Sequence, residues 1–212
     1  MLGTDGHLPA VPPDRLTAAA LRRRLQFPPD WQPEVRAEPP FSDRTPTQAA
    51  VLVPVVQRAE MPTVLLTQRS TGLASHSGQI AFPGGKVDAH DADAVAAALR
   101  EATEEVGLVV ERIEVIGTLP RYVTGSAFIV TPVVALLDPT HTLRLNPDEV
   151  AEAFEVPLAY LMNPAHHRRH ALQWQGVRRE WFSIPYDDAG RERFIWGATA
   201  GMLRNLYRLL VA

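Results

Sequence analysis

The chain of 212 residues contains no cysteine, which excludes disulfide bonds, a thiol nucleophile and a cysteine-ligated zinc site. No apolar run is long enough to cross a bilayer, and residues 1–13 lack the apolar core of a signal peptide. The formal net charge is only −3, which gives no indication of a surface for nucleic acid or anionic lipid. We therefore expect a cytoplasmic protein that binds neither nucleic acid nor membrane, as a monomer or a homodimer.

Apolar residues make up 46% of the chain, enough to fill one sizeable core. We expect residues 1–46 to form an N-terminal tail, a short helix and a proline-rich connector, and residues 47–212 to form one domain. Within the first region, residues 1–13 are predicted to be a loose tail, and Asp14 is predicted to cap a helix that runs to Leu25.

The domain mixes short strands with two longer helices. Strands are predicted at Ala49–Val56, Thr63–Thr67, Gln79–Phe82, Val109–Leu119, Ala127–Leu137, Glu149–Val156 and Val177–Ile184, with a turn at Pro83–Gly85. Helices are predicted at Asp93–Val106 and Trp196–Leu210. Because the elements do not follow a regular βαβ rhythm, we predict an α/β fold with a mixed β-sheet sandwiched between α-helices.

The first of these helices carries an unusual run of acidic residues. Glu101 and Glu105 are one turn apart, and Glu104 lies beside them, so the three carboxylates span an arc of roughly 100°. Like charges at this spacing destabilise a helix, whereas a hard divalent cation would stabilise them. Arg100 lies one turn before Glu104 and can hold that carboxylate in place.

A charged string of this kind is by itself typical of a solvated helix face, but its context is specific. Phe82-Pro83-Gly84-Gly85-Lys86 precedes the helix, and glycines let backbone N–H groups approach a phosphate. Gly85 is followed by five residues, Asp91, eight residues and then Arg100-Glu101-Ala102-Thr103-Glu104-Glu105-Val106-Gly107-Leu108. This pattern resembles the signature of the Nudix hydrolases, with Asp91 in place of a glutamate and one residue added before the arginine.

Both departures also occur in the coenzyme A diphosphatase branch of that family, and two further segments resemble this branch. The first is Leu65-Leu66-Thr67-Gln68-Arg69-Ser70, followed by Gly78 and Phe82. The second is Ile195-Trp196-Gly197-Ala198-Thr199-Ala200. The upstream segment departs at Ala74, where the branch has a second arginine. Since an arginine suits a phosphate, Ala74 puts selection for the 3′-phosphate of coenzyme A in doubt.

The resemblance implies a hydrolase that uses Mg²⁺ or Mn²⁺ to split a diphosphate in a small-molecule substrate. For coenzyme A or its derivatives the products would be 4′-phosphopantetheine and adenosine 3′,5′-bisphosphate. It also implies metal ligands, which are Glu101, Glu105, Glu104 and the backbone of Gly85. The general base is left open between Glu101 and an acid of a later loop, for which Glu149 is our first candidate and Glu152 the second.

The residues expected to bind substrate come from the upstream segment and the glycine turn: they are Arg69, His76, Gly84 and Lys86. Arg69 can equally be a structural ion-pair partner.

Three alternatives stay open at this point. The first is a Nudix enzyme for another nucleotide diphosphate, such as ADP-ribose, a dinucleotide or a nucleoside triphosphate. The second is a non-catalytic nucleotide-sensing domain. The third is a prenyl diphosphate isomerase, which the absence of cysteine disfavours.

Two groups of aromatic or basic residues are expected to be structural. Residues 166–170, which read His-His-Arg-Arg-His, are predicted to form an exposed loop. Trp174, Trp181 and Trp196 are predicted to pack in the core rather than to stack on an adenine.

Overall fold

Two strands form the centre of the main sheet. These are β2 (Thr47–Val56) and β8 (Phe128–Leu137), which pair in parallel along their whole lengths. Along β2 the side chains alternate between the two faces of the sheet, and both faces are apolar: Leu52 is buried on one face and Val53 on the other. A sheet with two apolar faces must be covered on both sides.

The structure is a computed structural model that describes residues 1–41, 44–72, 77–174 and 176–212. These residues form one sheet of eight strands and one of four. The large sheet also contains β3 (Thr63–Arg69), β4 (Ile80–Ala81), β5 (Gly84–Lys86), β6 (Ile113–Thr118), β7 (Tyr122–Val123) and β9 (Val150–Pro157). The small sheet contains, in order, β1 (Gly3–Thr4), β10 (Arg168–Trp174), β11 (Val177–Asp188) and β12 (Arg191–Trp196).

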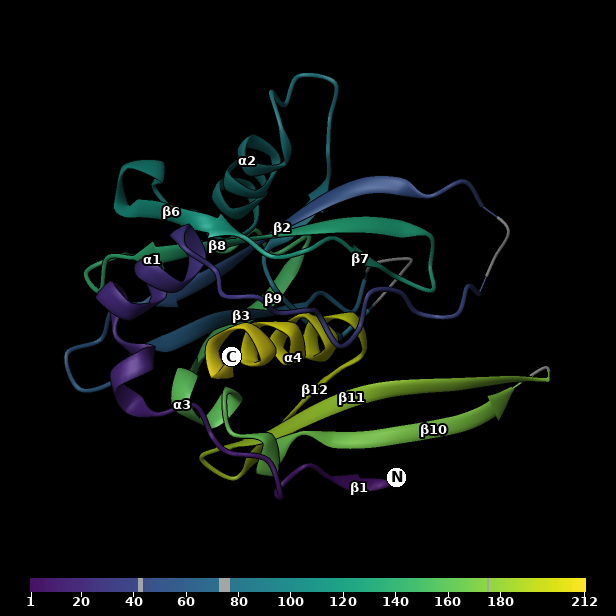
Figure 1. Cartoon of the computed structure of the whole chain (residues 1–212). Helices are drawn as coiled ribbons and strands as arrows, with labels where there is room; N and C mark the ends of the chain where they lie inside the picture. Colours follow the sequence, from purple (N-terminus) through teal and green to yellow (C-terminus); the bar gives the residue numbers. More distant parts are fainter. Residues whose placement is uncertain (42–43, 73–76, 175) are drawn as a thin grey trace.

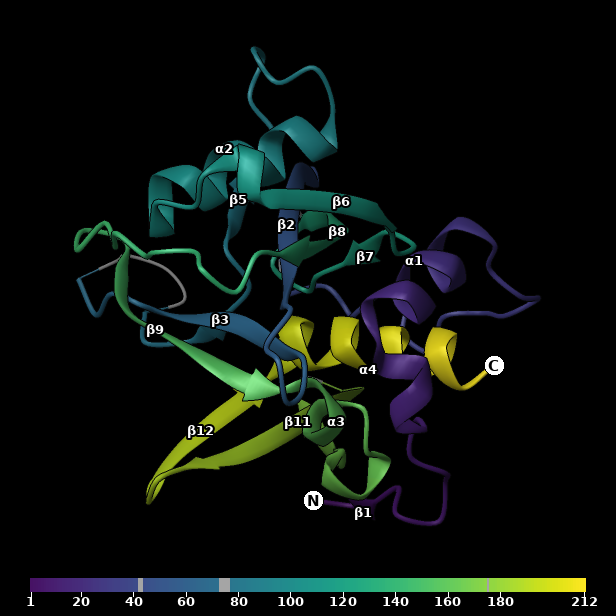
Figure 2. The ribbon, with the colours of Figure 1, turned by 90° about the vertical axis from the view of Figure 1, so that its left-hand side faces the viewer.

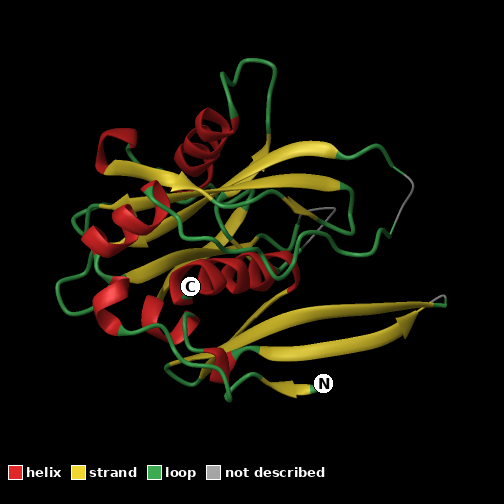
Figure 3. Ribbon diagram, in the orientation of Figure 1, coloured by secondary structure: helices red, strands yellow, loops and turns green. Residues whose placement is uncertain are grey.

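Helices cover both faces of the large sheet (Figures 1 and 2). Helix α2 (Ala94–Val106) packs on one face, and α1 (Ala18–Gln26) and α4 (Gly197–Val211) pack on the other. The short α3 (Leu158–Leu161) follows β9. The small sheet covers the other side of α4, as the colouring of Figure 3 makes clear. Because β2 and β8 are parallel and the other pairs are antiparallel, the prediction of a mixed sheet between helices is confirmed.

Helix α2 begins and ends where the sequence predicts. The Asp93 side chain accepts a hydrogen bond from the backbone N–H of Ala96 (2.8 Å), and Gly107 ends the helix in the left-handed conformation with φ 69°. The turn predicted at Pro83–Gly85 is wrong in part, because Gly84–Lys86 is extended and pairs with β2.

The cap predicted for the first helix is also wrong. Residues Pro13–Leu16 form a separate 3₁₀ turn, and α1 begins after it. Thr17 caps α1, since its hydroxyl accepts a hydrogen bond from the backbone N–H of Ala20 at 3.3 Å.

The N-terminal residues are not the loose tail that we predicted. Strand β1 pairs with β10, and the buried Asp5 lies 2.8 Å from Arg169 Nε and 2.9 Å from Arg204 Nη2. Glu34 places a second carboxylate 2.7 Å from Arg204 Nε. Asp5 and Arg169 are separated by 164 positions, so local sequence patterns could not indicate the pair.

The exposed loop predicted at residues 166–170 is wrong as well. His167 is fully buried, with Nε2 2.7 Å from the carbonyl oxygen of Leu161 and Nδ1 3.2 Å from Arg204 Nη1. Burial lowers the pKa of His167 to about 4, so the ring is neutral at pH 7. The next residues continue as β10.

Two of the three tryptophans that we predicted to be core residues are instead at the surface. Trp174 is 42% exposed and Trp196 is 40% exposed. Trp181 is half-buried and stacks on His170. Within the described ranges, no helix combines the length and the apolar character needed to span a membrane.

Replacing Arg204 tests whether the buried ion pairs fix the N-terminal region. Arg204→Met should lower the free energy of unfolding by about 3–5 kcal/mol, because the Asp5 and Glu34 carboxylates would lose a buried partner. Chemical denaturation measures this loss. Arg178→Met is the control: Arg178 pairs with Glu180 at the surface, so the change should stay below about 1 kcal/mol. Equal effects of the two substitutions would contradict this account.

Candidate functional site

The glycines of β5 bring the backbone close to the acidic face of α2. A side chain at Gly84, which has φ 157°, would place its Cβ 2.6 Å from Val51 Cα. A Cβ at Gly85 would lie 2.5 Å from Glu101 Oε1. Gly84 therefore requires glycine, because the close atoms there belong to the backbone, and glycine at position 85 lets the carboxylate of Glu101 lie directly against the strand.

Three carboxylates meet beside this strand. Glu101, Glu105 and Glu149 each offer an oxygen atom, and these oxygens lie within 4.8 Å of one another. The first two residues are one turn apart on α2, whereas Glu149 comes just before β9. The amide of Asn146 lies 3.3 Å from Glu149 Oε1, and its backbone N–H donates to the carbonyl oxygen of Glu105. We call Glu101, Glu105 and Glu149 the carboxylate cluster.

Burial makes the ionised form of this cluster costly. Glu105 is only 2% exposed, and desolvation raises its pKa to about 7, although the N–H of Gly84 (3.2 Å) and the charge of Arg69 oppose this rise. Desolvation also raises the pKa of Glu101 above its usual value. The nearby Glu149 raises both values further through like-charge repulsion.

Arg100 positions the carboxylates of α2 from the side. Its Nη1 donates to Glu101 Oε1 (2.9 Å) and to Glu104 Oε2 (3.0 Å), while Nε and Nη2 hold both oxygens of Asp91. These hydrogen bonds lower the pKa of Asp91 to about 2. Asp91, which stands where the family signature has a glutamate, thus anchors the arginine here. The side chain of Glu104 is 54% exposed and is not among the clustered carboxylates, so its predicted role as a ligand stays a prediction.

Three of the predicted substrate-binding residues form contacts with residues of the carboxylate site. Arg69 Nη1 lies 3.7 Å from Glu105 Oε1, which is the ion pair that we considered as its alternative role. Gly84 donates to the same glutamate, and the carbonyl oxygen of Lys86 accepts from Arg100. His76 and Ala74 lie outside the described residues.

Of our two candidates for an acid from a later loop, only Glu149 reaches the cluster. Glu152 instead lies 2.6 Å from Arg193 Nη2 and 2.6 Å from Arg191 Nη1, and the hydrogen bond from Arg193 contributes most to lowering its pKa to about 2. Sequence reasoning missed two supporting residues, Asn146 and the anchoring role of Asp91. No periodic signal marks either one.

The donor set fits a hard divalent cation. Carboxylate oxygens are the ligands that such cations prefer, and three of them converge here. Without a cation, their mutual repulsion and burial favour protonation, and a cation would reverse that preference.

The raised pKa of Glu105 predicts how the metal-free protein responds to pH. Because the folded-state pKa of about 7 exceeds the ordinary value of 4.5, this group's contribution to stability is present below pH 4.5 and is lost as pH rises through 7. Glu105→Gln should therefore be more stable than the wild type at pH 8 in chelator, by up to about 3 kcal/mol, and not at pH 4.5. Urea unfolding at both pH values measures the difference.

The control for this experiment is Glu104→Gln, which changes a half-exposed carboxylate on the same helix and should give no such gain. A Glu105→Gln protein that is less stable than the wild type at pH 8 would show that burial does not penalise this charge.

Comparison with known proteins gives the family that the sequence motifs resemble. The model of the NUDIX domain matches residues 46–175. A protein of Citrobacter koseri, named an uncharacterized Nudix hydrolase NudL, is 47% identical over 160 residues, which cover 75% of this chain and 80% of that protein. The protein of the same name from Escherichia coli K12 is 46% identical over the same coverage.

Solved structures show similar chains at lower identity. A MutT/nudix family protein from Enterococcus faecalis is 20% identical with a TM-score of 0.49, covering 80% of this chain and 64% of that one. A C. elegans Ap4A hydrolase in a binary complex is 26% identical with a TM-score of 0.46, covering 56% of this chain and 85% of that one. On the domain match and its sequence relatives, the chain belongs to the Nudix hydrolase family.

Proposed function

We propose that the protein hydrolyses the diphosphate bond of coenzyme A or its derivatives with Mg²⁺ or Mn²⁺. The observation that carries this proposal is the meeting of Glu101, Glu105 and Glu149 beside a glycine strand, in a member of the Nudix family. The choice of coenzyme A rests on the resemblance of residues 65–85 and 195–200 to the coenzyme A diphosphatase branch.

In this reaction the oxygen of a water molecule bonds to one phosphorus of the diphosphate. The bond from that phosphorus to the bridging oxygen breaks, and the second phosphate leaves with the electron pair. The products are 4′-phosphopantetheine and adenosine 3′,5′-bisphosphate. Divalent cations, when bound, neutralise the diphosphate and favour ionisation of the attacking water.

Different residues of the chain would bind the cations, position the carboxylates and contact the phosphates. Glu101, Glu105 and Glu149 would hold the cations, and Glu104 is a further candidate ligand at the exposed edge. Arg100 fixes the Glu101 carboxylate through a hydrogen bond of 2.9 Å. Gly85 lies against the same carboxylate, and its backbone is our candidate for a contact with a cation or a phosphate.

Arg69 has two roles in this proposal. It neutralises part of the Glu105 charge in the free protein, and its guanidinium can turn to the substrate diphosphate. Its Nε is buried and has no hydrogen-bond partner among the described residues, so a substrate oxygen would satisfy it. Lys86, which is exposed at the end of β5, provides a second cation for the phosphates.

Because Glu149 offers one of its two carboxylate oxygens to the cluster, its other oxygen is the first candidate for the general base. Glu149 stands on a different element from the two α2 carboxylates, and only Asn146 is hydrogen-bonded to its side chain among the described residues. Glu101 is the second candidate, but Arg100 already occupies one of its oxygens.

Loss of one clustered carboxylate should abolish activity without unfolding the protein. Glu105→Gln should lower kcat for coenzyme A at least 100-fold, because it removes a negative ligand from the cluster. Glu111→Gln, at an exposed position after α2, is the matched control and should keep the wild-type rate. Product formation followed by chromatography measures both variants. Full activity of Glu105→Gln would refute the assignment of the cluster.

A substrate panel tests the choice of coenzyme A. We expect kcat/KM for coenzyme A to exceed that for ADP-ribose, a dinucleotide and a nucleoside triphosphate under the same metal conditions. Comparing coenzyme A with dephospho-coenzyme A measures selection for the 3′-phosphate, which Ala74 leaves in doubt. A higher kcat/KM for ADP-ribose or a dinucleotide would leave the family assignment unchanged and would reject coenzyme A as the substrate.

A further inference from the structure

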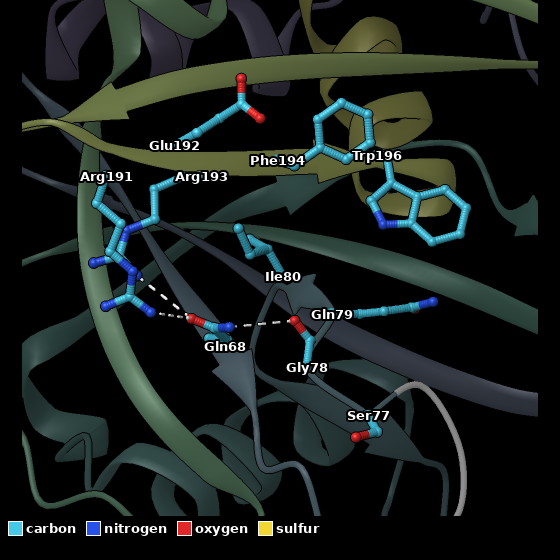
Figure 4. Close-up of a pocket in the computed structure, with 10 residues that line it drawn as sticks. All are labelled: Gln68, Ser77, Gly78, Gln79, Ile80, Arg191, Glu192, Arg193, Phe194 and Trp196. Atoms are coloured by element: carbon cyan, nitrogen blue, oxygen red, sulfur yellow. Dashed lines mark hydrogen bonds between the residues drawn. The ribbon is translucent and has the colours of Figure 1, made fainter.

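A pocket of about 380 Å³ lies between β12 and the end of β3 (Figure 4). It is on the side of the sheet opposite to α2 and the carboxylate cluster. Strand β12 forms one wall, and the end of β3 with the segment leading into β4 forms the opposite wall. Its volume falls within the range of small-molecule sites, roughly 300–1,000 Å³.

Two stretches of the chain that have no role in the proposed chemistry, residues 77–80 and Trp196, meet in this pocket. Residues 77–80 come from the upstream segment, and Trp196 comes from the segment at residues 195–200. The two are tied together by the hydroxyl of Thr199, which donates to the carbonyl oxygen of Ile80 at 3.1 Å in the buried interior. Two separate parts of the chain therefore form the opposite walls of one pocket.

Strand β3 links the pocket to the carboxylate cluster directly. Gln68 lines the pocket with Ile80 on the α4 side of the sheet. The next residue, Arg69, follows an irregularity in the pairing of β3 with β9 and reaches Glu105 of α2 on the opposite side. Backbone hydrogen bonds hold this junction, because Arg69 N–H donates to Gln79 and its carbonyl oxygen accepts from Gly78. A molecule whose diphosphate lies at the cluster would have to pass the end of β3 to place a second arm in the pocket.

The lining of the pocket suits a flat, neutral group. Trp196, which is 40% exposed, offers an aromatic surface at the end of β12. The cations of this wall are already paired: Arg193 is 4% exposed and binds Asp188 and Glu152, and Arg191 binds Glu152. These ion pairs leave little net charge to attract a phosphate.

Polar groups of the pocket can form hydrogen bonds with the edge of a flat ligand. Gly78 presents its carbonyl oxygen, to which the Gln68 amide donates at 3.5 Å, and Ser77 and Gln79 stand beside it (Figure 4). Aromatic side chains provide stacking surfaces for nucleobases, and amide and backbone groups bond to base edges. A flexible pantetheine arm has no aromatic ring that would stack on Trp196 in this way.

From these observations we propose that this pocket binds the purine base of the nucleotide half of the substrate, stacked against Trp196. The identification of the substrate half rests on the proposed function, whereas the preference for a planar base rests on the pocket alone. Trp196 then determines specificity and has no part in the hydrolytic step.

Binding of the two product halves tests the proposal without metal or turnover. Adenosine 3′,5′-bisphosphate and 4′-phosphopantetheine are each titrated into the full-length protein by calorimetry. Trp196→Ala should weaken binding of the bisphosphate about fivefold or more and leave phosphopantetheine unchanged. Trp196→Phe should retain binding, because it keeps a stacking ring, and it also shows that the position tolerates substitution.

Trp174→Ala is the matched control, since Trp174 is similarly exposed but lies on β10 outside the pocket. It should leave binding of both probes unchanged. With coenzyme A as substrate, Trp196→Ala should raise KM and leave kcat near the wild-type value.

Other outcomes overturn the proposal. These are no binding of the bisphosphate by the wild type, unchanged binding by Trp196→Ala, or a loss confined to phosphopantetheine. Absence of hydrolysis with intact, Trp196-dependent binding of the bisphosphate would instead reject the proposed function and keep the base site.

Discussion

The repulsion among three neighbouring carboxylates is the constraint around which this site is arranged. Burying a charged group is costly unless it is paired, and Glu105 is almost fully buried beside two others. The surrounding residues reduce that cost without removing it: Gly84 donates a hydrogen bond, Arg69 adds a charge, and Arg100 holds Glu101. A bound divalent cation, as the proposed function requires, would offset the remaining imbalance.

The fold makes this arrangement rigid. The parallel pair β2 and β8 is buried on both faces, so it fixes α2 on one side and α4 on the other. Strand β5 pairs with β2 and thereby sets the distance between its glycines and α2. The same sheet separates the carboxylate cluster from the pocket at β12, so the proposed chemistry and the proposed base binding lie on opposite sides of the sheet.

The sequence predicted the parts of this structure that depend on local periodicity. The spacing of Glu101 and Glu105 fixes them on one helix face, and Asp93 and Gly107 mark the ends of that helix. Glu149 could be named only as a candidate, because its approach depends on how β9 pairs with β3. Pairings between distant segments, including the ion pairs of the N-terminal residues and the exposure of two tryptophans, carry no periodic signal and could not be predicted.

The central claim is that Glu101, Glu105 and Glu149 together hold a divalent cation. Anomalous diffraction from crystals soaked in Mn²⁺ tests this most directly, because it locates the ion without reference to activity. We expect a peak among the oxygens of these three residues, next to Gly85. A peak that is bound only by exposed acids such as Glu104, with none inside the cluster, would contradict the account.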